Sequence, residues 1–311
     1  MGGAAPRRDA DRATPPAPAL KIRCPAKVNL GLWLLGRRPD GYHEIDTILQ
    51  AVSLEDELTL EPGPPGLKLT TLGRPIPGAE PNVIQRAWDL LTELGLLPRG
   101  AGVRARLTKR IPVGAGLGGG SSDAAGFLAG AERFFDLGLT EPERHALAAR
   151  LGSDVPFFLR GGIARATGRG EKVRHLCPID SFWLVLVSPA TAISTTWAYS
   201  QIRYPLTAHT VGATVLASSI KKRDLGGMVD AMHNAFESVI LVRLPKIDEM
   251  KRALASAGAI GALLSGSGST VFGVAHSLLS AQAVQSAVSG RCAEVRVVRS
   301  IEHGVTVSRL G

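Results

Sequence analysis

The sequence predicts an α+β protein with two domains. Strand patterns fill residues 20–70, helical patterns alternate with short strands after residue 82, and the pattern changes near Cys177 to Ser181. A chain of 311 residues is long enough to bury two cores. We therefore expect a disordered tail at 1–19, rich in Ala, Pro and Arg, a first domain at 20–178 and a second at 179–311.

The first domain is expected to begin with extended segments. Residues 20–35 alternate, but Pro25 interrupts them, which predicts a strand pair or hairpin. A turn at 37–43 follows from its Pro and Asp-Gly signals. Further strands are expected at 45–52, 57–61, 67–70 and 103–107.

Helices are expected where apolar residues recur at helical spacing. The candidate ranges in the first domain are 82–94, 122–137 and 141–151. Asn82 is a suitable N-cap for the first of them, and Ser121 and Ser122 for the second. Residues 161–170 are interpreted as a glycine-rich bend.

Strands and helices are also expected to alternate in the second domain. A buried-type strand is expected at 182–187, and residues 209–240 look helical with a loop near Gly226-Gly227. The remaining elements expected are a helix at 245–258, a strand, tight turn and strand at 261–273, a helix at 277–289 and a strand at 294–299.

Composition narrows the class of function. The net charge of +9 and the pI near 9.9 suit an anionic ligand. The basic residues are scattered, and aromatic residues are only 5%, so a nucleic-acid surface is not indicated. No apolar run reaches the ~18 residues of a membrane span, and no apolar segment follows Arg7-Arg8. Three distant cysteines form no CxxC or Cys/His cluster, which indicates reduced thiols in a cytoplasmic protein and no metal site.

The most informative stretch runs from Pro112 to Asp123, with five glycines within seven residues. Such a loop exposes backbone N–H groups, and the helix behind it adds a positive N-terminus, so the stretch predicts a phosphate site. A flexible linker is the alternative, but linkers are not usually flanked by a strand and an amphipathic helix. A dinucleotide fold is disfavoured because Pro112 breaks the connection to the strand and no acidic strand end follows. The chain has no Gly-Lys dipeptide, so it has no Walker A loop.

Three stretches together resemble the GHMP small-molecule kinases, which include galacto-, homoserine, mevalonate and phosphomevalonate kinases. The glycine loop is similar to the family's phosphate loop, Pro25 to Leu30 resembles its first motif, and Ser265 to Thr270 its third. The resemblance implies a first domain like the second domain of ribosomal protein S5, which binds ATP phosphates, and a ferredoxin-like second domain.

Two further stretches resemble one branch of that family. Arg38 to His43 and Leu151 to Phe158 are similar to motifs of members whose substrate is a cytidine-diphosphate-linked sugar alcohol. The resemblance implies ATP-dependent phosphorylation of that alcohol's 2-hydroxyl in the non-mevalonate pathway to isoprenoid precursors. Mg²⁺ is expected to arrive with ATP rather than in a protein cage. The chain is expected to be a monomer or a homodimer.

The resemblance assigns the chemistry to Lys27 and Asp154. By itself Asp154 could be a turn or cap residue, and Lys27 a solvated lysine of an edge strand. The family resemblance makes Asp154 the general base that accepts the hydroxyl proton. It pairs Lys27 with that carboxylate, where the ammonium keeps Asp154 ionised and stabilises developing charge.

Binding residues are carried over in the same way. Tyr42 would stack on cytosine, His43 would bond its edge, Tyr199 would cover its other face, and Asn29 would contact the substrate near Lys27. Asn82 is either only a helix cap or also an adenine-side residue. Gly266 and Ser267 could be a plain hairpin turn, or close the site near the substrate phosphates. The ATP-phosphate residues are Pro112, Gly114, Ala115, Gly116, Leu117, Gly118, Gly119, Gly120, Ser121 and Ser122.

Two other functions stay open at this stage. Another GHMP kinase, acting on homoserine or mevalonate, is the nearest, although such a substrate has no use for the Tyr42-His43 turn. A non-catalytic ATP- or nucleic-acid-binding module is the other, but a pure binder needs no Lys27 and Asp154.

Overall fold

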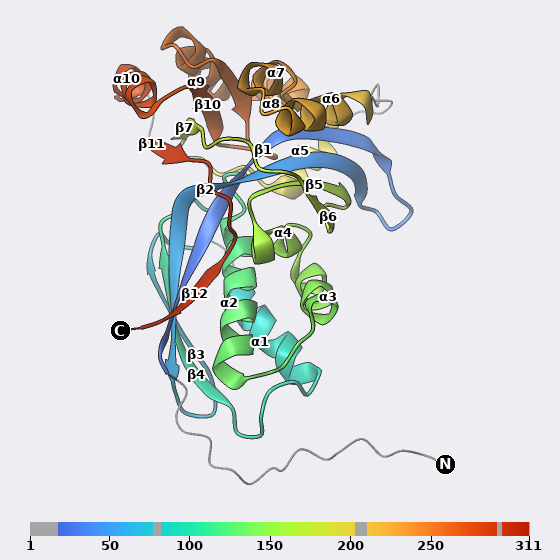
Figure 1. Cartoon of the computed structure of the whole chain (residues 1–311), viewed down its shortest axis with the longest axis vertical. Helices are drawn as coiled ribbons and strands as arrows, with labels where there is room; N and C mark the ends of the chain where they lie inside the picture. The colour runs from blue at the N-terminus through green and yellow to red at the C-terminus, as the bar shows by residue number, and fades with distance from the viewer. Residues whose placement is uncertain (1–17, 77–81, 203–209, 291–293, 311) are drawn as a thin grey trace.

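The structure is a computed structural model that describes residues 18–76, 82–202, 210–290 and 294–310 (Figure 1). The disordered tail was expected at residues 1–19, and residues 1–17 of it lie outside the part of the chain that the structure describes.

Two sheets organise the described chain. The larger contains eight strands: β1 Leu20–Arg37, β2 His43–Pro62, β3 Gly66–Gly73, β4 Gly102–Lys109, β5 Ile163–Gly168, β6 Lys172–His175, β8 His233–Asn234 and β12 Thr306–Arg309. The smaller has the order β11-β7-β10-β9, with β7 Trp183–Ser188, β9 Gly261–Leu264, β10 Val271–Ala275 and β11 Glu294–Arg299.

A long antiparallel ribbon of β1 and β2 is the frame of the first sheet. The predicted break at Pro25 was wrong, because β1 continues through it with a register shift between Pro25 and Ala26. Such an irregularity accommodates a residue that cannot donate to the ladder. The turn predicted at 37–43 is confirmed, and Asp40 accepts a hydrogen bond from the Tyr42 amide at 3.1 Å.

Four helices lie against one face of this sheet (Figure 1). They are α1 Val83–Glu93, α2 Gly119–Phe135, α3 Glu141–Leu151 and α4 Val155–Arg160. Asn82 caps α1 as predicted, accepting from the Ile84 amide at 2.9 Å. Ser121 and Ser122 were wrongly predicted as caps, because α2 begins at Gly119 behind a left-handed Gly118.

The second sheet carries α9 and α10, whereas α6 packs against β1 and β2 of the first sheet. The helices of this part are α5 Thr195–Ser200, α6 Thr210–Lys221, α7 Leu225–Asp230, α8 Glu237–Arg243, α9 Pro245–Ser256 and α10 Leu278–Val288. The loop predicted near Gly226-Gly227 was wrong, since Asp224 caps a helical turn there by accepting from the Gly227 amide at 2.9 Å. The bend predicted at 161–170 was also wrong in its centre, where buried residues form β5 between flanking glycines.

The two parts of the chain share strands. The C-terminal strand β12 returns to the first sheet, where it pairs with β1 (Figure 1). The short β8 pairs with the middle of β1 from the other part of the sequence. The boundary expected between residues 178 and 179 stays a prediction, and the two parts are tied together by these crossings.

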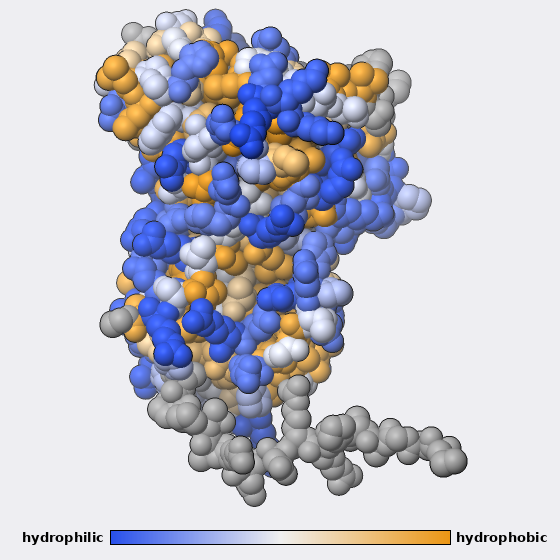
Figure 2. All heavy atoms as spheres, viewed as in Figure 1, coloured by the Kyte–Doolittle hydropathy of each residue, from blue (hydrophilic) through white to orange (hydrophobic). Residues whose placement is uncertain are grey.

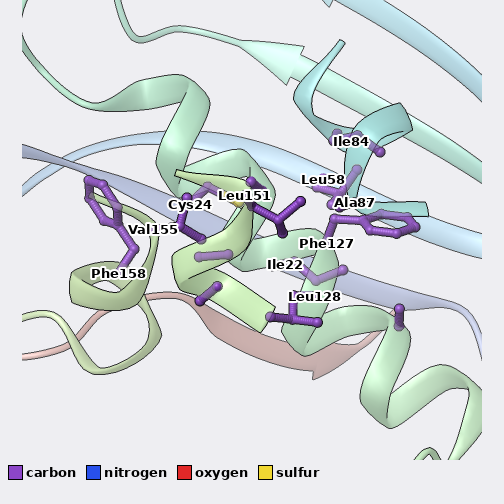
Figure 3. Packing of buried hydrophobic residues seen from close by; sticks show 14 of the residues in the cluster. Ile22, Cys24, Leu58, Ile84, Ala87, Phe127, Leu128, Leu151, Val155 and Phe158 are labelled. Atoms are coloured by element: carbon purple, nitrogen blue, oxygen red, sulfur yellow. The ribbon is translucent and has the colours of Figure 1, made fainter. Parts of the chain in front are cut away.

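The core beneath the first sheet is built from side chains of the sheet and all four helices. Figure 3 shows Ile22 of β1 near Phe127 of α2, and Cys24 of β1 near Val155 of α4 and Leu151 of α3, all in one buried cluster with Ile84 of α1. On the outer surface, Figure 2 shows hydrophilic residues over the viewed face with apolar residues scattered among them. Within the described ranges, no helix is long and apolar enough to cross a membrane.

Removing the ring of Phe127 tests this core. Phe127 is fully buried in α2, so Phe127→Ala should lower the free energy of unfolding by about 3–5 kcal/mol through lost transfer energy and a cavity. Urea unfolding followed by circular dichroism measures it. The control Val242→Ala, at a side chain 76% exposed, should change it by less than ~0.5 kcal/mol. Equal effects of both variants would contradict the assigned core.

Candidate active site

A cleft of about 600 Å³ collects residues from both parts of the chain. It is lined by Lys27 and Asn29 of β1, by the glycine loop, by Asp154 and by the turn before β10. All five stretches that carried the family resemblance therefore meet in one place. Its lining also contains most of the predicted binding residues, namely Tyr42, His43, Asn82, Pro112, Gly114 to Ser121, Tyr199, Gly266 and Ser267.

The glycine loop is held by backbone contacts on two sides. The Lys27 amide donates to the Leu117 carbonyl at 3.0 Å, and the Thr270 amide donates to the Ala115 carbonyl at 3.1 Å. Ser265 Oγ also donates to the Gly116 carbonyl at 2.9 Å. A Cβ on Gly116, whose φ is +76°, would lie 2.0 Å from the Ser265 carbonyl oxygen. Only glycine permits this approach, so the predicted third motif fixes the loop.

The loop leads directly into the N-terminus of α2. Gly118 has φ +70°, and a Cβ there would meet the Phe158 ring at 2.8 Å and Lys27 Cε at 3.1 Å. The amides of the first helical turn have no partners within the helix and carry the positive end of its dipole. Gly119, Gly120 and Ser121 of that turn line the cleft. This is the arrangement that binds phosphate groups.

Lys27 and Asp154 meet beside that helix terminus. Lys27 Nζ lies 3.5 Å from Asp154 Oδ2 and 2.5 Å from Asn29 Oδ1. The Lys27 side chain is only 5% exposed, so it is not the solvated edge-strand lysine of the alternative interpretation. Asp154 stands at the N-cap position of α4, but its side chain makes no capping hydrogen bond. Its carboxylate therefore faces the cleft and Lys27.

Asn29 orients Lys27 of this pair through a hydrogen bond. Its Nδ2 donates to Thr47 Oγ1 at 2.9 Å, and Thr47 Oγ1 donates to the Gly31 carbonyl at 2.6 Å. Because the amide nitrogen is used in this way, its oxygen is the atom left to accept from Lys27. The chain of bonds fixes the lysine ammonium at one place in the cleft.

Aromatic side chains gather at the other end of the cleft. The rings of His43 and Tyr199 stack with centroids 4.5 Å apart, which brings together two residues 156 positions distant in sequence. Tyr42 is 54% exposed, and the Arg169 guanidinium carbon lies 4.7 Å from its ring centroid. Burial lowers the pKa of His43, and the charge of Arg37 lowers it further. The neutral imidazole is thereby favoured, and it can both donate and accept a hydrogen bond.

A buried charge cluster beneath the glycine loop was missed by the sequence analysis. Lys109 Nζ donates to Asp56 Oδ2 at 2.5 Å and to Asp123 Oδ2 at 2.6 Å, and all three side chains are almost fully buried. Burial acts to lower the pKa of Lys109, but the two carboxylates outweigh it and raise that pKa. Burial raises the pKa of Asp123 to about 7, with Lys109 opposing the shift and Asp56 adding to it.

Two arginines that line the cleft were missed as well. Arg86 extends from α1, where its Nη2 donates to the Leu151 carbonyl at 3.3 Å, and Arg169 lies in the turn between β5 and β6.

The sequence contains one weak signal for the buried cluster of Asp56, Lys109 and Asp123. Lys109 is the only basic residue of β4 whose position falls on the buried side of the alternation.

Two predicted residues have a different environment from the rest. Ser122 is buried, it does not line the cleft, and its Oγ has no hydrogen-bond partner among the described residues. Asn82 both caps α1 and lines the cleft, so the structure accommodates both interpretations of it. Within the described ranges, no group of three or more His, Cys, Asp or Glu side chains could hold a metal ion.

Comparisons with known proteins agree with this geometry. The family description "GHMP kinases N terminal domain" matches residues 82–162, and "GHMP kinases C terminal" matches residues 216–294. A curated relative from Pelotomaculum thermopropionicum, named 4-diphosphocytidyl-2-C-methyl-D-erythritol kinase, is 40% identical over 276 residues, covering 88% of this chain and 96% of the relative.

Solved structures extend the comparison. A crystal structure of 4-(cytidine 5'-diphospho)-2C-methyl-D-erythritol kinase matches with a TM-score of 0.75 and 32% identity, over 90% of this chain and 99% of that one. A homoserine kinase from Cytophaga hutchinsonii matches with a TM-score of 0.73 over 96% of this chain and 99% of that one. Its 21% identity shows a shared fold alone.

Neutralising Lys109 tests the buried cluster. Lys109→Met should leave two carboxylates buried without a cation and lower the free energy of unfolding by about 3–5 kcal/mol at pH 8. The loss should be smaller at pH 5, because the Asp123 carboxyl, whose pKa burial raises, is protonated there, so fewer buried charges are left without a cation.

Urea unfolding at both pH values measures the loss. Lys68→Met is the control, since Lys68 is exposed on β3 and forms no ion pair with a described residue. A loss for Lys109→Met that is the same at pH 5 and pH 8 would argue against the electrostatic origin of the effect.

Proposed function

This chain belongs to the GHMP kinase family, and on that basis we propose that it transfers the γ-phosphoryl group of ATP to the 2-hydroxyl of 4-diphosphocytidyl-2-C-methyl-D-erythritol. The products are the 2-phosphate and ADP, and the step belongs to the non-mevalonate pathway to isoprenoid precursors. The observation that carries the proposal is the Lys27–Asp154 pair, which lies in the same cleft as the glycine loop and the aromatic side chains.

The donor end is assigned to the glycine loop. The triphosphate lies over residues 114–121, where backbone amides and the α2 dipole attract it. Ser122 was predicted with these residues, but its side chain is buried, so in this proposal it contributes only as part of the first turn of α2 and makes no side-chain contact with the phosphates. Arg86 adds a positive charge to this end, and we assign an adenine contact to Asn82, which lines the same cleft.

The chemical step needs a base and a stabiliser of negative charge. Asp154 accepts the proton of the attacking hydroxyl as the new O–P bond forms and the bond to ADP breaks. Lys27, fixed by Asn29 at 2.5 Å, holds the carboxylate in place and stabilises charge on the transferred group. The remaining catalysis comes from positioning donor and acceptor on either side of this pair.

The acceptor end is assigned to the aromatic pocket. Cytosine is assigned to the face of Tyr42. Tyr199, predicted to cover the other face of the base, instead stacks on His43, and both rings line the same cleft. Arg169, stacked on Tyr42, supplies a cation on the same side as the substrate's diphosphate. Gly266 and Ser267 close the cleft between the two ends.

Mg²⁺ accompanies ATP in this proposal. In this proposal the ion would be held by the phosphate oxygens of ATP, and the residues of the glycine loop would position the complex. When bound, the ion neutralises phosphate charge during transfer. We further propose a cytoplasmic enzyme that acts as a monomer or homodimer.

The fold alone does not select the acceptor. The homoserine kinase that matches in structure shows how far the same architecture extends beyond one substrate. Tyr42, His43 and Tyr199 favour the cytidylyl substrate over homoserine or mevalonate, which have no base to stack. A non-catalytic binding module is disfavoured by the buried, oriented Lys27 opposite Asp154.

Removing the base should abolish turnover. Asp154→Ala should lower kcat by at least ~10²–10⁴-fold, because the hydroxyl proton loses its acceptor. The affinity for ATP should change by less than ~3-fold, since the glycine loop is intact. Coupled ADP release and calorimetry measure the two quantities. Asp180→Ala, at a carboxylate 84% exposed, is the matched control. Turnover of Asp154→Ala close to that of the wild type would remove Asp154 as the base.

Truncating Tyr42 tests the choice of acceptor. Tyr42→Ala should raise the KM for the cytidylyl alcohol by about 5–100-fold, the worth of one stacked base, and leave the KM for ATP within ~2-fold. Leu279→Ala, at another exposed apolar side chain (77%), controls for surface change.

The same assay should include mevalonate and homoserine as alternative acceptors. Turnover of either at the rate of the cytidylyl alcohol, or an equal rise of both KM values in Tyr42→Ala, would count against the proposed substrate.

A further inference from the structure

The cluster of Asp56, Lys109 and Asp123 holds both ends of the glycine loop. Asp56 Oδ1 accepts from the amides of Arg110, at 2.5 Å, and Ile111, at 2.9 Å, where the chain leaves β4 for the loop. Lys109 connects the same carboxylate to Asp123 on α2, where the loop ends. The cluster therefore fixes the loop at its beginning and at its end.

The cluster also lies directly beneath the phosphate site. Lys109 and Asp123 belong to the wall of the cleft. Lys109 Nζ would be 3.3 Å from a Cβ on Gly119, the first residue of α2. A triphosphate on the helix terminus would therefore bring its negative charge close to this ammonium and its two carboxylates.

The charges of the cluster do not balance. Two carboxylates share one ammonium, and the other groups that face Asp123 do not compensate, because Cys24 of β1 is a buried neutral thiol whose pKa burial raises. Arg86 of α1 lines the same cleft but makes no ion pair with Asp123. If all three groups are ionised, the interior carries one uncompensated negative charge below the place where phosphates bind.

One oxygen of the cluster is free to take a proton. Both oxygens of Asp56 are engaged, by two amides and by Lys109. Asp123 Oδ2 accepts from Lys109, but Asp123 Oδ1 is buried without a hydrogen-bond partner in the described chain. Asp123 is the member of the cluster that can become neutral without breaking a bond.

We infer that Asp123 is the charge-balancing residue of the donor-phosphate site, and that its Oδ1 takes up a proton from solvent when the triphosphate of ATP binds above Lys109. This inference deepens the proposed function and rests on it, because the polyphosphate is the kinase's donor. Asp123 acts through Lys109 and the loop, so it is a positioning residue rather than a catalytic one.

The charge of the phosphates determines how ATP binding and the protonation of Asp123 affect each other. A pKa near 7 means that the Asp123 carboxyl is mostly ionised at pH 8 in the free protein. Added phosphate charge raises that pKa further, because a second anion nearby disfavours the carboxylate. Binding then takes up a proton, so ATP affinity should weaken as the pH rises from 6.5 to 8.5. Asp123→Asn cannot titrate and should lose this dependence.

Calorimetric titration with a non-hydrolysable ATP analogue at pH 8 tests the inference, using buffers of low and high ionisation heat. The wild type should take up at least ~0.3 proton per bound nucleotide more than Asp123→Asn. From pH 6.5 to 8.5 its Kd should rise ~3–10-fold relative to that variant. Asp89→Asn, which removes an exposed carboxylate of α1 outside the cleft, should behave as the wild type.

A second variant keeps the test decisive if Asp123→Asn does not fold. Asp56→Asn retains an acceptor oxygen for the loop amides and leaves one carboxylate per ammonium, so Asp123 should stay ionised and the extra uptake should vanish. Equal uptake in the wild type and a folded variant would overturn the inference. Proton release on adding Mg²⁺, present in the wild type and lost in Asp123→Asn, would overturn it too, since it would make Asp123 a metal ligand.

The outcome is separable from the proposed function. A wild type that phosphorylates the cytidylyl alcohol but shows no extra proton uptake would contradict the inference alone. A wild type that takes up the proton on binding the nucleotide analogue, but phosphorylates no acceptor, would contradict the proposed function while leaving the role of Asp123 in place.

Discussion

The close contact between the glycine loop and its two neighbours is the constraint on which the site depends. The loop backbone bonds to β1 through Lys27 and Leu117, and to the turn before β10 through Ala115 and Thr270. These contacts leave no space for a Cβ on Gly116, so composition and geometry are coupled there. Because the loop is held on both sides, the first turn of α2 and the Lys27 ammonium keep fixed positions relative to each other.

Both parts of the chain contribute to that contact, which explains the crossed connectivity of the fold. The first sheet supplies the long strand that carries Lys27 and Asn29, and the second sheet supplies the turn that covers the loop. The strands β8 and β12 return to β1 and join the two parts. A cleft formed between two connected parts suits a reaction between two bound substrates, one at each end.

Much of this arrangement could be predicted from the sequence, and the failures have physical reasons. Helices with a clear apolar stripe, such as α1 and α9, were located closely, and so was the strand pair around 261–273. The break at Pro25 and the caps at Ser121 and Ser122 were wrong because the tertiary structure overrode local preference, by a register shift and by a left-handed glycine. The strand β12 was missed because its four residues gain their pairing only from β1.

The residues of the candidate site also fall into those that could be predicted from the sequence and those that could not. Residues in dense motifs were predicted, because glycine runs and the stretches around Lys27 and Asp154 are visible without a fold. Lys109, Asp56 and Asp123 were not recognised as a unit, since their partnership exists only after three elements pack together.

The most direct test of the proposed site is a crystal structure with a non-hydrolysable ATP analogue and the cytidylyl alcohol. We expect the γ-phosphate over the amides of the first turn of α2 and the 2-hydroxyl in hydrogen-bond reach of Asp154 (about 2.6–3.2 Å). A triphosphate bound away from this turn, or a 2-hydroxyl out of reach of Asp154, would contradict it.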